Sequence, residues 1–255
     1  MNFHRLVTIT AAFVAVVGIS EPTQAQDVPA ETSTEVEESK EGPPTSISVV
    51  LKQDIFFGFH AIGQVAVGLN DLVDVTFYTI LWTRPGFGAG GGGADLWTEW
   101  GPGLNFKFLD GNLSVNPQFG LLNGTLLSGA GRGLFFEGIV PNLTVTYGDA
   151  LFQGQLYAGF YIGLRELDDS SRNDFIHYWA NAGVAPLSWL SIGAHWESLI
   201  QTRGAATNEV ETVYQWIGPY IEARAAMGFI RFAGGADLEP EDTADFYQVS
   251  IGLSF

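Results

Sequence analysis

The sequence predicts an all-β fold: a transmembrane, antiparallel, up-and-down β-barrel of twelve strands, behind a signal peptide and a disordered acidic segment. Three observations predict it. From Thr45 to Phe255, apolar and polar residues alternate with a period of two, which is typical of strands with one face toward lipid and one toward a lumen. Charged residues are only 15% of the chain, against about 25% in soluble domains. The first residues follow the pattern of an export signal.

The amino-terminal segment predicts secretion. Residues 1–5 carry a positive charge, residues 6–19 are apolar, and residues 23–25 (Thr-Gln-Ala) form a small-residue cleavage site. The apolar stretch is shorter than the roughly 20 residues that a membrane-spanning helix needs. We therefore expect residues 1–25 to be a cleaved signal peptide and not a retained anchor. Residues 26–44 combine acidic residues with Pro, Ser and Thr, which predicts a disordered periplasmic segment, with a docking tail as the alternative.

The barrel is predicted to span residues 45–255, and its closing strand shows the pattern clearly. Apolar residues at alternate positions from Tyr247 to Phe255 are expected to face lipid, and Phe246, Gln248 and Ser250 to face the lumen. A closing strand that ends in Phe resembles the signal that bacterial outer-membrane barrels present to their assembly machinery. We therefore expect that machinery, outer-membrane lipid and lipopolysaccharide as partners, and the outer membrane of a Gram-negative-type cell as the location.

The connections between strands alternate in length. Short ones are predicted near residues 70–71, 110–111, 148–149, 186–188 and 226–227, and longer ones at 85–95, 127–133, 166–173, 203–211 and 239–243. In outer-membrane barrels the short turns are periplasmic and the longer loops extracellular. Eleven strands are clear in the sequence, and an even number requires a twelfth. Ile47, Val49, Leu51 and Ile55 supply it as the first strand, with a tight connection at 54–57; ten strands is the alternative count.

A soluble β-sandwich is the alternative fold, because it too is built from short alternating strands. The signal segment, the terminal Phe and the aliphatic character of one face argue against it. Aromatic residues near strand ends are expected in the two membrane interfaces. These are Trp82, Trp100, Tyr147, Trp189 and Trp196.

Several segments resemble the Tsx-like nucleoside-specific channel family, which are twelve-stranded outer-membrane barrels. They are residues 46–50 (SISVV), 64–78 with Asn70-Asp71-Leu72-Val73-Asp74-Val75, 96–102 (LWTEWGP), 112–115 (NLSV) and the closing strand to Phe255. The resemblance covers most of residues 46–255 in order and spacing, and it implies a twelve-stranded channel. The substrate-binding aromatic residues of that family have no matched positions here, so nucleoside specificity is not implied.

The inward rows predict a lumen lined by opposed charges and aromatic rings. The predicted pore-lining residues are Trp97, Glu99, Lys107, Tyr157, Tyr161, Arg165, His177, Trp179, His195, Glu197, Tyr214, Trp216, Tyr220, Glu222, Arg224 and Arg231, joined by Asp74 and Asp237. Such a lining would orient a small polar solute with a flat apolar part, such as a nucleoside or a sugar. We therefore predict a porin-like channel for passive diffusion. The alternative is a plugged structural or adhesion barrel, whose ion pairs merely fill the lumen.

An outer-membrane barrel enzyme of the lipase or acyltransferase type is a third, weaker hypothesis. Its best signal is His195-Trp196-Glu197-Ser198, where a carboxylate and an imidazole share a face. Ser198 is expected on the opposite face and so would not complete a catalytic triad. We predict no catalytic residues.

Other chemistry is disfavoured by composition. The chain has no Cys and 28 acidic residues against 11 basic ones, a net charge of −17, which argues against nucleic acid as a partner. The glycine-rich run at 86–93 lacks the Lys-Ser/Thr of a phosphate-binding loop and is expected to be a flexible outer loop. Acidic residues of the outer loops lack the spacing of a calcium loop. We predict no cofactor, no metal site and a monomer.

Overall fold

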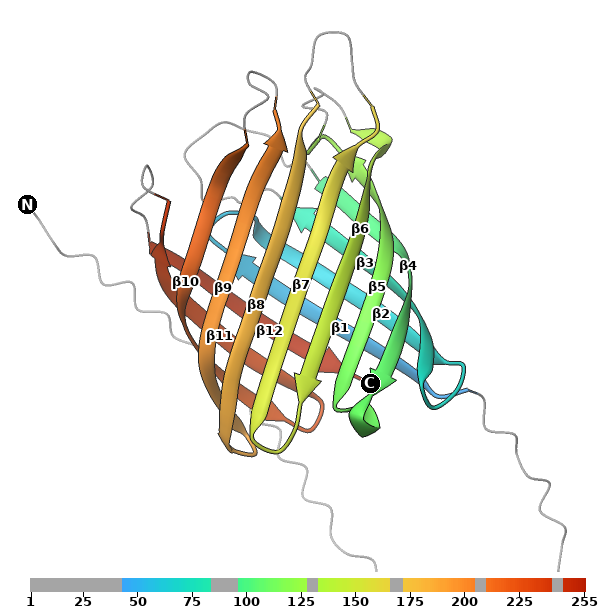
Figure 1. Ribbon diagram of the computed structural model, residues 1–255, viewed down its shortest axis with the longest axis vertical. Helices are drawn as coiled ribbons and strands as arrows, with labels where there is room; N and C mark the ends of the chain where they lie inside the picture. Colours follow the sequence, from blue (N-terminus) through green and yellow to red (C-terminus); the bar gives the residue numbers. More distant parts are fainter. Residues whose placement is uncertain (1–42, 84–95, 128–132, 166–171, 205–209, 240–244) are drawn as a thin grey trace, which may run out of the picture. The chain divides into compact units, whose positions relative to one another are not determined.

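Twelve antiparallel strands form a closed barrel in the described part of the chain (Figure 1). The computed structural model describes residues 43–83, 96–127, 133–165, 172–204, 210–239 and 245–255. The strands are β1 (Thr45–Asp54), β2 (Gly58–Gly68), β3 (Val73–Thr83), β4 (Leu96–Phe108), β5 (Leu113–Gly124), β6 (Leu134–Gly148), β7 (Phe152–Gly163), β8 (Asp174–Leu187), β9 (Leu190–Arg203), β10 (Glu211–Ala225), β11 (Gly228–Asp237) and β12 (Asp245–Ser254). The predicted fold class and the count of twelve are confirmed, and the count of ten is wrong.

Each strand pairs with its neighbours in sequence, and β1 pairs with β12 to close the barrel. At this seam the backbone N–H of Ile47 donates to the carbonyl of Phe255 at 3.0 Å, and that of Phe255 donates to the carbonyl of Ile47 at 2.8 Å. Closure leaves no strand edge with unpaired backbone groups, which is what a sheet in lipid requires. The predicted first strand therefore completes the barrel.

The connections divide the barrel into two ends (Figure 1). The short-turn end holds connections 69–72, 109–112, 149–151, 188–189 and 226–227, and the long-loop end holds 55–57, 84–95, 125–133, 164–173, 204–210 and 238–244. The predicted turns and loops are thus confirmed in position. The connection 55–57, between β1 and β2, is the exception in length: it is a short turn at the end where the other connections are long.

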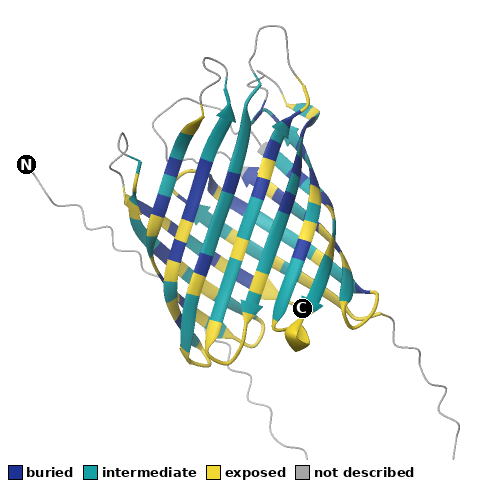
Figure 2. Cartoon of the chain, in the orientation of Figure 1, coloured by how far each residue is buried: buried dark blue, intermediate teal, exposed yellow. Residues whose placement is uncertain are grey.

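The two faces of each strand differ as the alternation predicts. In β12, Tyr247, Ile251 and Leu253 are exposed on the outside, while Phe246 and Gln248 are buried inside. Figure 2 shows the same alternation of exposed and covered residues along the other strands. The exposed apolar row suits contact with lipid, because apolar side chains are more stable in a hydrocarbon environment than in water.

Trp82 contradicts the prediction that it lies in a membrane interface. Its side chain is inside the barrel and only 6% exposed, because Tyr78, Ile80 and Trp82 form the inward row of β3. Trp189 and Trp196 are exposed on the outside as expected. The sequence of β3 is apolar on both faces, so its alternation does not mark the inner one.

No helix of the described residues is long and apolar enough to cross a membrane. The predicted signal peptide, most of the predicted acidic segment and the glycine-rich run at 86–93 lie outside the described residues.

Candidate functional site

A cavity of about 580 Å³ occupies the lumen. Gly148, the last residue of β6, and Met227, in the turn between β10 and β11, line one extremity, and Phe57, Trp82 and His177 line the other. Its volume is within the roughly 300–1,000 Å³ of small-molecule sites. We call this space the lumen cavity.

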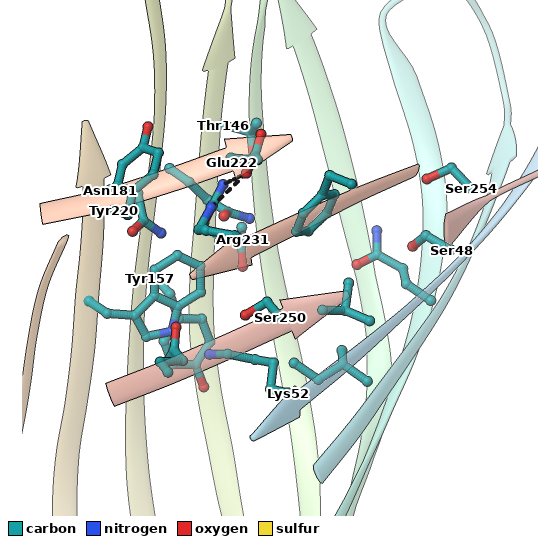
Figure 3. Close-up of a pocket in the computed structure, with 18 of the residues that line it drawn as sticks. Ser48, Lys52, Thr146, Tyr157, Asn181, Tyr220, Glu222, Arg231, Ser250 and Ser254 are labelled. Carbon is teal, nitrogen blue, oxygen red and sulfur yellow. Dashed lines mark hydrogen bonds and ion pairs between the residues drawn. The ribbon is translucent and has the colours of Figure 1, made fainter. Parts of the chain in front are cut away.

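Three cations from β1, β11 and β10, with β12 between β1 and β11, form one wall of the lumen cavity. Lys52 comes from β1, Arg231 from β11 and Arg224 from β10. Arg224 Nε lies 2.5 Å from Glu222 Oε1 and Arg231 Nη2 lies 2.6 Å from Glu222 Oε2. One buried carboxylate therefore holds two guanidinium groups, and Figure 3 shows the pair of Glu222 and Arg231 in the wall.

The facing wall is neutral and rich in amides and aromatic rings. Tyr157 of β7 and Trp179 of β8 are register partners, and their rings stack with centroids 5.7 Å apart. Neutral polar side chains extend this wall: Gln118, Thr144, Thr146, Gln153, Gln155 and Asn181. This wall supplies hydrogen-bonding groups and a flat apolar surface without net charge.

An aromatic cluster narrows the lumen above the cavity, toward the long-loop end. We call Phe57, His60, Trp82, His177 and Tyr214 the constriction. Phe57 packs against Trp82 with centroids 4.8 Å apart and against His177 at 5.5 Å, and His60 stacks on Trp82 at 4.7 Å. A second void of about 20 Å³, bounded by the same Phe57, Trp82 and His177, lies against the constriction.

The turn between β1 and β2 carries Phe57 into the lumen because Asp54 shapes it. Asp54 Oδ1 accepts hydrogen bonds from the backbone N–H of Phe56 at 3.0 Å and of Phe57 at 2.5 Å, an Asx-type turn. Asp54 Oδ2 lies 4.0 Å from His60 Nδ1. Asp54 is only 1% exposed, and its carboxylate thus fixes the position of the Phe57 ring that narrows the lumen.

Glu197 joins four strands beside the constriction. Its Oε1 lies 2.9 Å from His177 Nε2 and accepts from the Tyr214 hydroxyl at 2.9 Å, and its Oε2 accepts from Gln248 at 3.2 Å and lies 3.2 Å from His195 Nε2. These partners come from β8, β10, β12 and β9. A buried carboxylate needs such partners, because an unpaired charge in a dry interior costs several kcal/mol.

A second buried network lies on the other side of the lumen. The Tyr78 hydroxyl donates to Glu99 Oε1 at 2.6 Å and accepts from Asn142 at 2.8 Å. Gly120 lies beneath the Tyr78 hydroxyl, and a Cβ there would collide with it. A larger residue at position 120 would therefore displace the Tyr78 hydroxyl from Glu99.

Part of the long-loop end also packs inward. Leu127, in the connection between β5 and β6, is fully buried with Leu122, Val140 and Tyr161. Its backbone N–H donates to Glu137 Oε1 at 2.7 Å.

At the short-turn end, by contrast, Asp149 is exposed. The hydroxyl of Tyr147 and two backbone N–H groups donate to its carboxylate, and these hydrogen bonds hold the pKa of Asp149 below its usual range.

The comparisons with known proteins agree with this architecture. The model of a family described as "Family of unknown function (DUF6733)" matches residues 12–255. The chain belongs to this family. No curated protein matches its sequence at a significant level.

Solved outer-membrane channels and porins are among the structures to which this DUF6733 chain is similar. The COG4313 outer membrane channel from Pseudomonas putida F1 matches over 88% of this chain and 100% of its own, with 12% identity and a TM-score of 0.51. A KdgM porin matches over 82% and 99%, with 11% identity and a TM-score of 0.47. A NanC porin matches over 82% and 98%, with 11% identity and a TM-score of 0.47. The first similarity shows a shared fold; the resemblance to Tsx-like channels stays a prediction.

The structure places nine of the predicted pore-lining residues of the DUF6733 chain on the lumen cavity. They are Tyr157, Tyr161, His177, Trp179, Glu197, Tyr220, Glu222, Arg224 and Arg231. Glu99, His195, Tyr214 and Trp216 are buried inside the barrel without lining the cavity. Their side chains instead take part in buried contacts outside the cavity, with Tyr78, Glu197 and Asp237.

Three predicted residues lie elsewhere. Arg165 follows the end of β7 and is exposed at the long-loop end, because the inward row of β7 stops before it. Lys107 pairs with Asp74 at 2.9 Å near the short-turn end, and Trp97 donates to the Thr125 hydroxyl at 3.1 Å. None of the three lines the lumen cavity.

Sequence reasoning missed the lining residues that come from the first three strands and the turn between β1 and β2, among them Lys52, Asp54, Phe57, His60 and Trp82. The first strand was predicted from its outward residues alone. Taking the complementary positions of the same alternation would have placed Lys52 and Asp54 on the inner face.

The arrangement at His195 and Ser198 does not form a catalytic triad. His195 Nδ1 lies 2.8 Å from Asn181 Oδ1, and the hydroxyl of Ser198 is buried without a hydrogen-bond partner among the described residues. No group of three or more His, Cys, Asp or Glu in the described part of the chain is arranged to hold a metal ion.

Proposed function

We propose that this chain is an outer-membrane channel for passive diffusion of small polar solutes, with the constriction as the step that limits passage. The lumen cavity carries the proposal. A barrel of this size can be filled by its own side chains. Here about 580 Å³ remains free, bounded by charged, amide and aromatic groups that would replace the water around a solute.

The outer surface supports a membrane location. Exposed apolar side chains such as Phe77, Phe119, Phe160 and Phe232 point outward from several strands. In water such a surface would be costly, whereas in lipid it is the expected partner of the hydrocarbon core. The channel of Pseudomonas putida F1 is described as an outer membrane protein, and its shared fold supports the same location here.

The solute class follows from the two walls. Cations and amides offer hydrogen bonds, and the Tyr157–Trp179 stack offers a flat apolar surface. Both suit a nucleoside or a sugar, in keeping with the sequence resemblance to Tsx-like channels. This choice of solute is part of the proposal.

A plugged structural barrel is the second candidate, and the constriction is the observation that favours it. Phe57, Trp82 and His177 pack closely, and a void of about 20 Å³ lies beside them. The two candidates differ in one respect: in a channel the β1–β2 turn must move enough to pass a solute, and in a plug it stays in place.

Single-channel conductance of the refolded barrel in a planar bilayer separates them. We expect steady conductance that added nucleosides or sugars reduce. Thr146→Trp, which places a large ring in the lumen cavity, should lower the conductance. Val145→Trp, the adjacent lipid-facing position, serves as the matched control and should not. Absence of conductance from a folded sample would overturn the channel and favour the plug.

A further inference from the structure

The lumen cavity exposes its cations and buries its carboxylates. The Arg224 and Arg231 side chains are 36% and 14% exposed, while Glu222 between them is 2% exposed. Asp54 and Glu197 are each 1% exposed. A solute in the cavity therefore meets guanidinium and ammonium groups at its surface, although the lining contains as many carboxylates as Lys and Arg side chains.

Each carboxylate is already engaged by the protein. Glu222 binds two arginines, Asp54 accepts two backbone N–H groups, and Glu197 lies among His177, His195, Tyr214 and Gln248. Two guanidinium groups on one carboxylate leave one positive charge without compensation. The exposed wall is thus net cationic.

Lys52 adds a second positive charge, and this one forms no ion pair among the described residues. Among the described residues it has no carboxylate within ion-pair distance, and its ammonium lies 5.2 Å from the centroid of the Trp179 ring. That contact is a cation–π interaction, which holds the side chain across the cavity while leaving its N–H donors free. Lys52 is therefore positioned to bind an acceptor that the protein does not supply.

The sheet register brings Lys52 and Arg231 to the same acceptor position. Lys52 pairs with Ser250, and Ser250 pairs with Arg231 on its other side. In Figure 3 the Ser250 hydroxyl lies between the two cationic side chains. Neighbouring strands are about 5 Å apart, so two long side chains separated by one strand can approach one anionic group from both sides.

The carboxylates at the constriction determine where in the cavity an anion would bind. Asp54 and Glu197 lie at the constriction, where Asp54 binds the backbone of Phe57 and Glu197 contacts His177. They would repel an anion from the constriction and leave the level of Lys52 and Arg231 as the favourable position. Clefts lined by one sign of charge concentrate ligands of the opposite sign, and rings of Lys and Arg select anions in pores.

We propose that the lumen cavity binds a small organic anion, whose carboxylate or phosphate group lies between Lys52 and Arg231 and whose hydroxylated or ring-shaped body lies against Tyr157 and Trp179. This inference deepens the proposed function. Passage of the anion through the barrel rests on the proposed channel, but binding of the anion does not, because binding requires no open constriction.

Calorimetric titration of the refolded barrel in detergent tests binding directly, with two matched pairs of probes. Glucuronate is compared with glucose, and adenosine monophosphate with adenosine, because each pair differs by its anionic group. We expect the anion of at least one pair to bind at least tenfold more tightly than its neutral partner. The pair that shows it distinguishes a carboxylate from a phosphate ligand.

Substitution locates the site. Lys52→Gln should weaken anion binding about tenfold and leave the neutral partner unaffected, and Lys52→Arg should restore most of the affinity. Arg172→Gln, which removes a cation paired with Asp174 at the long-loop end, is the charge-matched control and should have no effect. Circular dichroism shows whether each variant is folded, and the Lys52→Arg variant keeps the test valid if Lys52→Gln does not fold.

The outcomes separate the two proposals. Preferred anion binding that Lys52→Gln weakens supports the site, whether or not the barrel conducts. Conductance with equal binding of anion and neutral partner, or anion binding that Lys52→Gln leaves unchanged, overturns the site and leaves the channel standing. Anion binding without conductance supports the site and overturns the channel.

Discussion

The two halves of the lumen are made by the same twelve strands and yet have opposite characters. Toward the short-turn end many of the inward residues are Ser, Thr, Gln and partly exposed Arg, with the Phe229 ring among them, and the space between them is free. Toward the long-loop end the inward residues are aromatic, and they pack on one another with charged groups buried among them. The same alternation thus gives an open cavity where inward side chains are short or solvated, and a closed core where they are large and apolar.

The difference comes from two inward-turning connections as much as from the strands. Asp54 fixes the β1–β2 turn so that Phe57 enters the lumen. Leu127 of the β5–β6 connection is buried against Leu122, Val140 and Tyr161. At the other end Met227 of the β10–β11 turn reaches the lumen cavity but is 59% exposed, so it closes nothing. The narrowing of the lumen therefore depends on a few residues, and substitution of those residues tests it directly.

The largest expected effect is on conductance. Phe57→Ala combined with Trp82→Ala removes two rings of the constriction that pack on each other, so single-channel conductance should rise several-fold in a planar bilayer. Hydrophobic constrictions are the parts of pores that block water and ions. Phe229→Ala, which removes a ring that lines the cavity near the short-turn end, is the control and should change conductance little. An unchanged conductance in the double variant would show that the barrier lies elsewhere.

A smaller effect is expected on stability, and it compares the two buried carboxylates. Glu197→Gln removes a charge whose partners are all buried, whereas Glu222→Gln frees two arginines that the cavity's water can solvate. We expect losses of about 2 kcal/mol for Glu197→Gln and about 1 kcal/mol for Glu222→Gln, since buried groups left unsatisfied cost more than exposed ones. Urea unfolding of the barrel in lipid vesicles measures both. Equal losses would contradict the proposed difference between the halves.

The smallest effect concerns the exposed turn at Asp149. Its folded pKa is below the usual value because the Tyr147 hydroxyl and the backbone N–H groups of Leu151 and Phe152 bind the ionised form. The associated stability is present above the unfolded pKa and is lost as pH falls through the folded pKa. Asp149→Asn should therefore lower the urea midpoint slightly at neutral pH, and the difference should vanish in acid. Asp71→Asn, in another short turn, is the control.

Much of the fold could be predicted from particular residues. Tyr247 to Phe255 alternates cleanly, and Asp110-Gly111 marks a turn, so strand faces and connections were predictable along most of the chain. In β3 the apolar residues Phe77 to Trp82 occupy both faces, and alternation there carries no information about which one is inside. Trp82 was misplaced for that reason. The inward row of β7 was extended one position too far, to Arg165, because a period of two does not mark the end of a strand.

The sequence by itself determined which residues face lipid in most strands, where the chain turns, and twelve as the preferred strand count over ten. These are local properties, because side-chain direction in a strand reverses at each residue. Only the tertiary structure decided that the lumen is open at one end and narrowed at the other, and that Lys52, Ser250, Arg231 and Glu222 form one row. Such a row joins residues far apart in the chain, and its members are set by the register in which the closed barrel pairs its strands.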